Sequence, residues 1–383
     1  MPINYLELQP QITEYCQRAG DEIANRPGKI AQAIMLLKQL AQELKDGLKN
    51  DLSSRVNSSS VNRCALPAAE AIDLSYKTSS TTTYALLASD GSQITSNHHD
   101  ALPVSLINTS TVFMQFSKGT APEIQTQSEF LRDDDGALIT DFINEKLVNT
   151  TRDVREINVL ANYPYNADNP LIVLSDGPLE LFQEPRSEAK HLALFKKYLQ
   201  ALFSLSRQAR ITAGYTDKPR ADLVIKMLEW VYAAQADTDM SNITDTHVFS
   251  EILSPGERSA IFLLHSPSSK AYRGEIQLHF FYLNVGTEKY PWIVRIEIPS
   301  GTAHAKEAIA LLQKALLDQC ALMGTRPYPY ILHRAHEEAV VSFQEREQLI
   351  NSLTHTLFDM GFPTTSISNK QDAKDLGKRT RLK

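Results

Sequence analysis

Cysteine is scarce in this sequence. The 383 residues contain three cysteines, Cys16, Cys64 and Cys320, and no two of them form a CxxC pair. This pattern excludes a disulfide framework and a zinc ribbon, and it favours a reducing compartment. The sequence also lacks a basic leader followed by an apolar stretch, and it has no apolar run of the ~18 residues that a transmembrane helix needs. We therefore expect a cytoplasmic protein without a membrane segment.

Glycine is sparse where nucleotide-binding loops would need it. The chain has 15 glycines but no Gly-Gly pair, and no Gly-Lys precedes Ser or Thr. A Walker A loop is thereby excluded, and no glycine-rich adenosine loop is evident.

A surplus of positive charge is also missing. The formal net charge is −6, while 42% hydrophobic and 22% charged residues are typical of a globular protein. A nucleic acid would therefore have to be bound through local basic patches and through cations held by acidic groups.

The chain begins with a predicted helical arm. Apolar residues recur at helical spacing on both sides of Arg26-Pro27-Gly28, which predicts two helices with a break between them. A connection rich in serine and asparagine follows over residues 51–62. We expect an arm and connection over 1–65, an α/β domain over 66–362, and a disordered basic tail over 363–383.

The order of elements after residue 80 predicts an RNase H-like fold. Apolar runs within 83–88 and 104–116 predict a meander of three strands, after which helices and strands alternate. This alternation favours parallel pairing through right-handed crossovers, in a mixed sheet flanked by helices. The alternating elements are a helix over 141–163, a strand over 171–174, a helix over 187–207, a strand over 211–215 and a helix after Pro219.

Further elements are expected towards the carboxyl end. Three strands are predicted over 260–265, 275–284 and 292–298, the last two antiparallel. Two helices follow, over 303–323 and 332–360, each ended by a glycine. We expect these elements to be additions to the core.

Two aspartates follow apolar strands in the same way. Ser89-Asp90-Gly91-Ser92 ends one predicted strand, and Ser175-Asp176-Gly177-Pro178 ends another. Open α/β sheets bind ligands at the carboxyl ends of their strands, so Asp90 and Asp176 could share a site. Two repelling carboxylates are tolerated where a divalent cation bridges them, and oxygen ligands favour magnesium or manganese. The alternative is that each Asp-Gly is only a turn.

Two further candidates have ordinary structural explanations. Glu156 follows Arg152 by four residues on a predicted helix, so an exposed ion pair would account for it. His336 lies on the same side of the last predicted helix as Leu332 and Ala339, where a histidine commonly serves packing alone. By position alone, neither residue indicates chemistry.

Five motifs, in order, resemble the NurA nuclease family. They are strand-Asp90-Gly91-Ser92, Arg152-Asp-Val-Arg-Glu156, Leu174-Ser175-Asp176-Gly177, Ala213-Gly214-Tyr215-Thr-Asp-Lys218 and Tyr328-Pro329-Tyr-Ile-Leu-His-Arg-Ala335-His336, within residues 83 to about 345. The resemblance implies an RNase H-like, manganese-dependent DNA nuclease, with magnesium as the other candidate ion. It also implies single-strand endonuclease and 5′-to-3′ exonuclease activity, a homodimer, and action with a HerA-type hexameric ATPase in the resection of double-strand breaks.

The resemblance also implies the site residues. Asp90, Glu156 and Asp176 would bind the metal, His336 would be a further ligand or a proton donor, and Tyr328 would complete the catalytic set. The family glutamate is expected a little before the second strand-Asp-Gly, and 20 residues separate Glu156 from Asp176, so local insertions could shift the correspondence. Glu145 is the alternative.

Four basic residues are candidates for binding DNA. Lys218 and Arg220 lie in the loop after Tyr215, and Arg207 and Arg210 lie at the end of the preceding helix. A solvated helix terminus explains them equally well.

Two other functions stay open. A non-catalytic adaptor could use the same fold to bind the ATPase or DNA. An actin-like ATPase or sugar kinase also places Asp-Gly after strands, although the glycine shortage counts against it.

Overall fold

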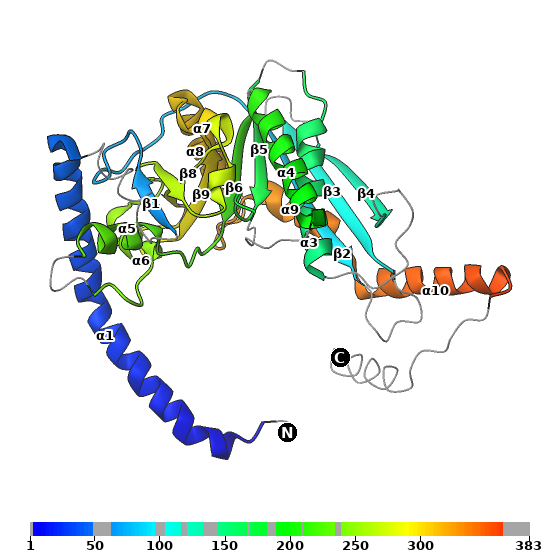
Figure 1. Ribbon diagram of the computed structural model, residues 1–383, viewed down its shortest axis with the longest axis horizontal. Coiled ribbons are helices and arrows are strands. Elements are labelled where there is room, and N and C mark those ends of the chain that lie inside the picture. Colours follow the sequence, from blue (N-terminus) through cyan, green and yellow to red (C-terminus); the bar gives the residue numbers. More distant parts are fainter. Residues whose placement is uncertain are drawn as a thin grey trace. The chain divides into compact units, whose positions relative to one another are not determined.

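The computed structural model describes residues 3–48, 63–95, 104–115, 121–132, 145–166, 169–181, 189–208, 210–233 and 239–362. Within them the chain divides into two compact units (Figure 1). The first unit contains Met1–Thr82, Gly177–Phe182 and Ile211–Pro329, and the second contains Thr83–Asp176, Gln183–Arg210 and Tyr330–Lys383. None of the helices in these described ranges is long and apolar enough to cross a bilayer.

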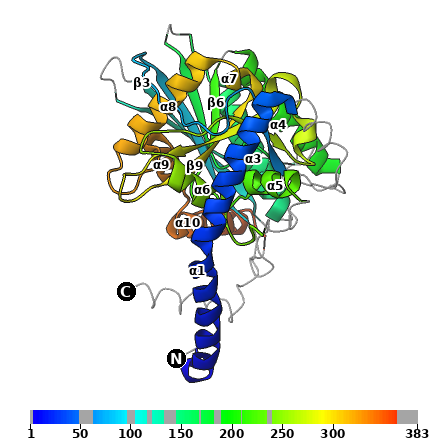
Figure 2. The same cartoon turned by 90° about the vertical axis from the view of Figure 1, so that its left-hand side faces the viewer.

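The first unit begins with a single long helix, α1 (Tyr5–Glu43), which continues into a π-helical turn over Leu44–Leu48 (Figure 2). The expected break at Pro27 is wrong, because Pro10 and Pro27 both lie inside the helix. A proline removes one backbone hydrogen bond and can bend a helix without ending it. Only the second half of α1 is buried, through Ala33, Leu36, Leu37, Leu40 and Ala41.

The sheet of the first unit is antiparallel throughout, in the order β1-β7-β8-β9-β6. The predicted antiparallel pairing of the last two strands is confirmed by the β8–β9 register. The strands are β1 (Cys64–Pro67), β6 (Ile211–Thr216), β7 (Phe262–His265), β8 (Leu278–Asn284) and β9 (Ile293–Pro299). The helices are α5 (Leu223–Val231), α6 (Asp245–Ile252), α7 (Ser300–Ala303) and α8 (Lys306–Ala321), with 3-10 turns over Ser269–Ala271 and Gly274–Ile276.

The second unit holds the predicted meander and the parallel strand beside it, in the order β5-β2-β3-β4. The strands are β2 (Ala85–Ile94), β3 (Leu106–Gln115), β4 (Glu123–Phe130) and β5 (Leu171–Asp176). The helices are α3 (Glu145–Asn162), α4 (Ala189–Arg207), α9 (Tyr330–Ala339) and α10 (Phe343–Asp359). Three antiparallel strands with a parallel strand beside the first is the arrangement expected of an RNase H-like mixed sheet.

Two details of the second unit differ from expectation. Residues 104–116 contribute one strand instead of two, and the third strand of the meander is β4, whose Glu-Ile-Gln-Thr-Gln-Ser-Glu-Phe sequence lacks an apolar face. The last predicted helix is two helices, because Ser342 begins α10 with a capping box that it forms with Glu345. Part of the predicted helix over 141–163 and the whole of 363–383 lie outside the described residues.

Candidate functional site

The register of β2 and β5 places Asp90 and Asp176 at neighbouring positions. The two strands pair in parallel from Ala85↔Leu171 to Ser89↔Ser175, so each aspartate lies one residue beyond the last pair. Asp176 is the last residue of β5, as expected, but Asp90 lies inside β2, opposite Ser110 of β3. Asp90-Gly91 therefore does not form the turn that the alternative explanation required.

His336 reaches Asp90 from α9. Its Nδ1 lies 2.7 Å from Oδ2 of Asp90, and its side chain is 62% exposed while that of Asp90 is 16% exposed. Two contacts hold the end of α9 against the sheet, because Ser92 and Asn108 both donate to the carbonyl of Ala339. These anchors lie one turn beyond His336 and fix its distance from β2. The histidine is thus not a packing residue, since it is exposed and pairs with a carboxylate.

Helix α3 brings a second set of charged groups to the same strand segment. Nε of Arg152 lies 3.3 Å from Oε1 of Glu156, and Nη2 of Arg152 donates to Asp153 at 3.0 Å. A Cβ atom at Gly91 would lie 2.6 Å from Oε1 of Glu156 and 2.7 Å from Cγ of Arg152. A glycine is therefore required for this helix to approach β2 so closely.

The two sets lie on opposite faces of β2. Successive residues of a strand point to opposite faces, so Asp90 and Ser92 face α9 while Gly91 and Gln93 face α3. The contacts agree, because Ser92 bonds to α9 and Gln93 donates to Asn149 of α3. Glu156 and Arg152 thus approach Asp90-Gly91 from the α3 side of the sheet, and His336 approaches it from the α9 side.

Charge and burial act together on Glu156. Its side chain is 13% exposed. Burial raises its pKa well above the ordinary value, the charge of Arg152 opposes the rise, and Asp153, Asp90 and Asp176 add to it. A carboxyl group whose pKa is raised by burial and by neighbouring like charges is typical of a functional site, and a nearby cation opposes that rise.

The donor chemistry suits a hard divalent cation, but the ligands are not gathered around one point. Within the described ranges, no group of three or more His, Cys, Asp or Glu side chains is arranged to hold a metal. Oε1 of Glu156 is buried and accepts no hydrogen bond, although it forms the ion pair with Arg152. Arg152 and His336 instead occupy the carboxylates of Glu156 and Asp90.

Two predicted residues lie apart from this cluster. Tyr328 belongs to the first unit, where its ring packs edge-on against Tyr215 at 5.4 Å. Glu145 is exposed at the first residue of α3, eleven residues before Glu156, which corresponds to ~16 Å along a helix. The charges of Asp90 and Asp176 act on Glu156, so Glu156 fits the site better than Glu145.

The candidate DNA contacts differ from one another. In the first unit, Lys218 adopts a positive φ of 43° and places Nζ 4.1 Å from the Trp292 ring, whose Nε1 donates to Asp217. Arg220 is exposed in the same loop. Sequence reasoning missed Trp292, because a residue at the start of a distant strand carries no signal of this contact.

In the second unit, the guanidinium of Arg210 donates to the carbonyls of Leu160 at 2.5 Å and Tyr163 at 2.6 Å. The Leu160 carbonyl is in the last turn of α3, so Arg210 caps that helix. Arg207 lies 5.8 Å from the ring of Phe203 on its own helix. Capping explains Arg210 without DNA, as the alternative in the sequence analysis allowed.

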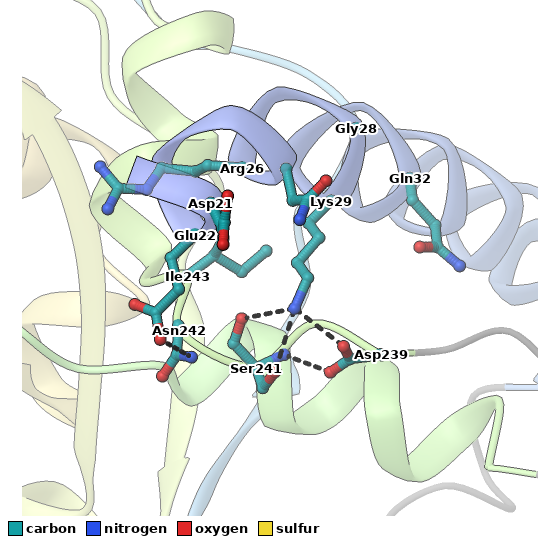
Figure 3. Close-up of a pocket in the computed structure, with 11 residues that line it drawn as sticks. Asp21, Glu22, Arg26, Gly28, Lys29, Gln32, Asp239, Ser241, Asn242 and Ile243 are labelled. Carbon is teal, nitrogen blue, oxygen red and sulfur yellow. Dashed lines mark hydrogen bonds and ion pairs between the residues drawn. The ribbon is translucent and has the colours of Figure 1, made fainter. Parts of the chain in front are cut away.

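A cavity of about 650 Å³ in the first unit lies where α1 meets residues 239–243 (Figure 3). Lys29 crosses it to bond with Asp239 and Ser241, and Asn242 donates to Glu22. These interactions connect α1 to residues 239–243 across the cavity. A second cavity, of about 750 Å³, lies in the second unit and is lined by 161–166, 169–171, Gln208 and Arg210. Asp90, Glu156 and Asp176 line neither cavity.

The comparison with protein families matches residues 84–341 to the NurA domain. No curated protein matches the chain. Solved structures with similarity include the catalytic domain of human endonuclease V, with 14% identity and a TM-score of 0.32, covering 84% of this chain and 99% of that one. Argonaute from Aquifex aeolicus has 13% identity and a TM-score of 0.29, and the match covers 69% of this chain and 29% of Argonaute. The RNase H1 named LC9 has 7% identity and a TM-score of 0.22, and the match covers 36% of this chain and 63% of the RNase.

Proposed function

Because the chain belongs to the NurA nuclease family, we propose that it is a metal-dependent DNA nuclease whose site is formed by Asp90, Glu156, Asp176 and His336. The observation that carries this proposal is the β2–β5 register, which puts two aspartates one residue beyond the last parallel pair. Helices α3 and α9 add a glutamate and a histidine to the same segment. Three carboxylates and one imidazole are a donor set that fits manganese or magnesium.

The metal would be held by Asp90, Glu156 and Asp176, and when bound it would supply a polarised phosphate and a nucleophile at neutral pH. The protein's own residues would position the reacting groups and protonate the departing oxygen. The Asp90 carboxylate holds Nδ1 of His336, which orients the imidazole and leaves Nε2 of an exposed ring for a proton transfer to the departing oxygen. Tyr328 would orient a phosphate or the attacking water.

Family membership also supports finer proposals. We place the protein in the resection of double-strand breaks, as a homodimer with manganese as its cofactor, cutting single strands internally and degrading 5′ ends. A HerA-type hexameric ATPase would supply the movement of DNA. We propose that this ATPase binds to α1, because the first half of the helix carries the exposed side chains of Leu6 and Tyr15. A Leu6→Glu/Tyr15→Glu variant that binds the ATPase as well as wild type does would eliminate this surface.

The deciding experiment is cleavage of labelled single- and double-stranded DNA in manganese, magnesium or EDTA. Asp90→Asn and Asp176→Asn keep the side-chain shape and should lower the cleavage rate by 10²-fold or more, on the order seen when a transition-state contact is removed. Glu156→Gln should act in the same way, whereas Glu145→Gln, on the same helix but exposed, should cleave at the wild-type rate.

Circular dichroism melts show whether each variant is folded. Wild-type protein that folds but cuts no DNA, even with its ATPase present, would refute the proposal and favour a non-catalytic adaptor. Equal loss in Glu156→Gln and Glu145→Gln would remove the assignment of the middle carboxylate.

A further inference from the structure

We propose that Arg152 exchanges partners during the reaction: it neutralises the acidic site before the metal binds, and it contacts the scissile phosphate afterwards. This inference rests on the nuclease function proposed above. It assigns to Arg152 a role beyond the surface ion pair that its spacing from Glu156 suggests.

The first support is the position of the arginine. It pairs with Glu156 and Asp153, and its side chain is 32% exposed, so it lies neither in the core nor freely in solvent. Burial lowers its pKa, but the charges of Glu156, Asp153 and Asp90 outweigh burial and raise it. Arg152 therefore pairs with two carboxylates and is affected by the charge of a third.

The second support is that the contact with Glu156 is electrostatic and loose. Nε of Arg152 and Oε1 of Glu156 lie 3.3 Å apart and form an ion pair but no hydrogen bond. Both atoms are buried, and neither has a hydrogen-bond partner. Each atom therefore has an unused bonding position. A divalent cation could take the carboxylate oxygen, and a phosphate oxygen could accept from the guanidinium.

The third support is that the described ligands are not arranged as a metal site. If Arg152 lies where the metal ion would bind, the metal could bind only after the arginine has moved away. The carboxylates would then close around the ion. Gly91 permits both arrangements, because its missing side chain leaves room for Glu156 and for the stem of Arg152. Asp90 also acts electrostatically on Arg152, so a displaced guanidinium would remain near the carboxylates and could donate to a phosphate oxygen.

The test uses three variants of the full chain. Arg152→Met removes the charge and keeps the length of the stem, and Arg152→Lys keeps the charge but loses the planar fork. Arg155→Met is the matched control, because Arg155 is on the same helix but pairs with Glu129 of β4. Binding of Mn²⁺ alone is measured from the signal of the free ion in electron paramagnetic resonance, without DNA, and cleavage is then measured at saturating Mn²⁺.

Arg152→Met should bind Mn²⁺ about tenfold more tightly, since one charge ~6 Å from a divalent ion repels it by about that factor even with the screening of water. The same variant should cleave ~10²-fold more slowly at saturating Mn²⁺, because a donor to the phosphate is lost. Arg152→Lys should bind Mn²⁺ as wild type does but still cleave slowly. Arg155→Met should match wild type in both measurements.

Two results would overturn the inference. One is an affinity of Arg152→Met for Mn²⁺ that equals or falls below that of wild type, and the other is wild-type cleavage by Arg152→Met. Arg152→Lys provides the same cleavage test if the methionine variant does not fold. Wild-type protein that neither binds Mn²⁺ nor cuts DNA would instead overturn the proposed function, so the two failures are distinct.

Discussion

Replacing Gly91 with alanine tests the site through a single methyl group. The backbone at Gly91 cannot retreat, because β2 pairs there with Thr109 of β3. The new Cβ would lie 2.6 Å from Oε1 of Glu156 and 2.7 Å from Cγ of Arg152, whereas ordinary carbon contacts are ~3.5–4.0 Å. These side chains must therefore move by about 1 Å.

The size of the effect follows from which atoms move. Oε1 is the far end of a flexible side chain, so a rotation of Glu156 relieves that contact, but Cγ of Arg152 is in the stem of its side chain and must shift as well. Together these changes should cost about 1–3 kcal/mol of the free energy of unfolding, the range for overpacking. The same rotation misplaces a proposed metal ligand, and a shift of ~1 Å in such a group can slow a reaction by ~10²-fold. We expect a moderate loss of stability and a large loss of cleavage.

The assay is single-turnover cleavage of a labelled oligonucleotide, together with urea unfolding of the same preparations. The matched control is Gly20→Ala in α1, where a new Cβ meets no atom within 4 Å. This control should cleave at the wild-type rate. If Gly91→Ala also cleaves at the wild-type rate, the close approach of α3 to β2 has no role in catalysis and the reasoning is refuted.

Three further predictions concern residues outside the acidic cluster. Arg210→Met should lower the free energy of unfolding by about 1–3 kcal/mol through loss of the α3 cap, with an unchanged salt dependence of DNA binding; a changed slope would restore its role as a DNA contact. Lys218→Ala/Arg220→Ala should reduce the slope of log affinity against log salt concentration by about 2, and an unchanged slope would contradict this. Burial raises the pKa of Asp245 to about 6 from an ordinary value of 3.8. A raised folded pKa means that the folded state binds the extra proton, so this group makes stability fall as pH rises from about 4 to 6. Urea unfolding of Asp245→Asn should lack that part of the pH dependence, and the same pH dependence in both proteins would exclude Asp245 as its source.

The sequence predicted several elements correctly because their patterns are local. The apolar run Leu171–Leu174 is β5, and Gly324 and Gly361 follow helices with φ of 64° and 81°. The predictions failed where a local rule competed with tertiary packing. Pro27 predicted a break, yet α1 continues through it. Ser89-Asp90-Gly91-Ser92 predicted the end of a strand, yet β2 extends to Ile94 because β3 pairs with it along its whole length.

The acidic residues could be chosen from the sequence, but their arrangement could not. The strand ends were enough to select Asp90 and Asp176, and the resemblance of the ordered motifs to the NurA family selected Glu156 and His336 as candidates. The register of β2 and β5, the opposite faces from which α3 and α9 approach, and the need for Gly91 all depend on residues far apart in sequence. Those features arise from packing between elements, which local periodicity does not encode. The pairing of Asp90 with His336, 246 residues later, is therefore decided by tertiary structure alone.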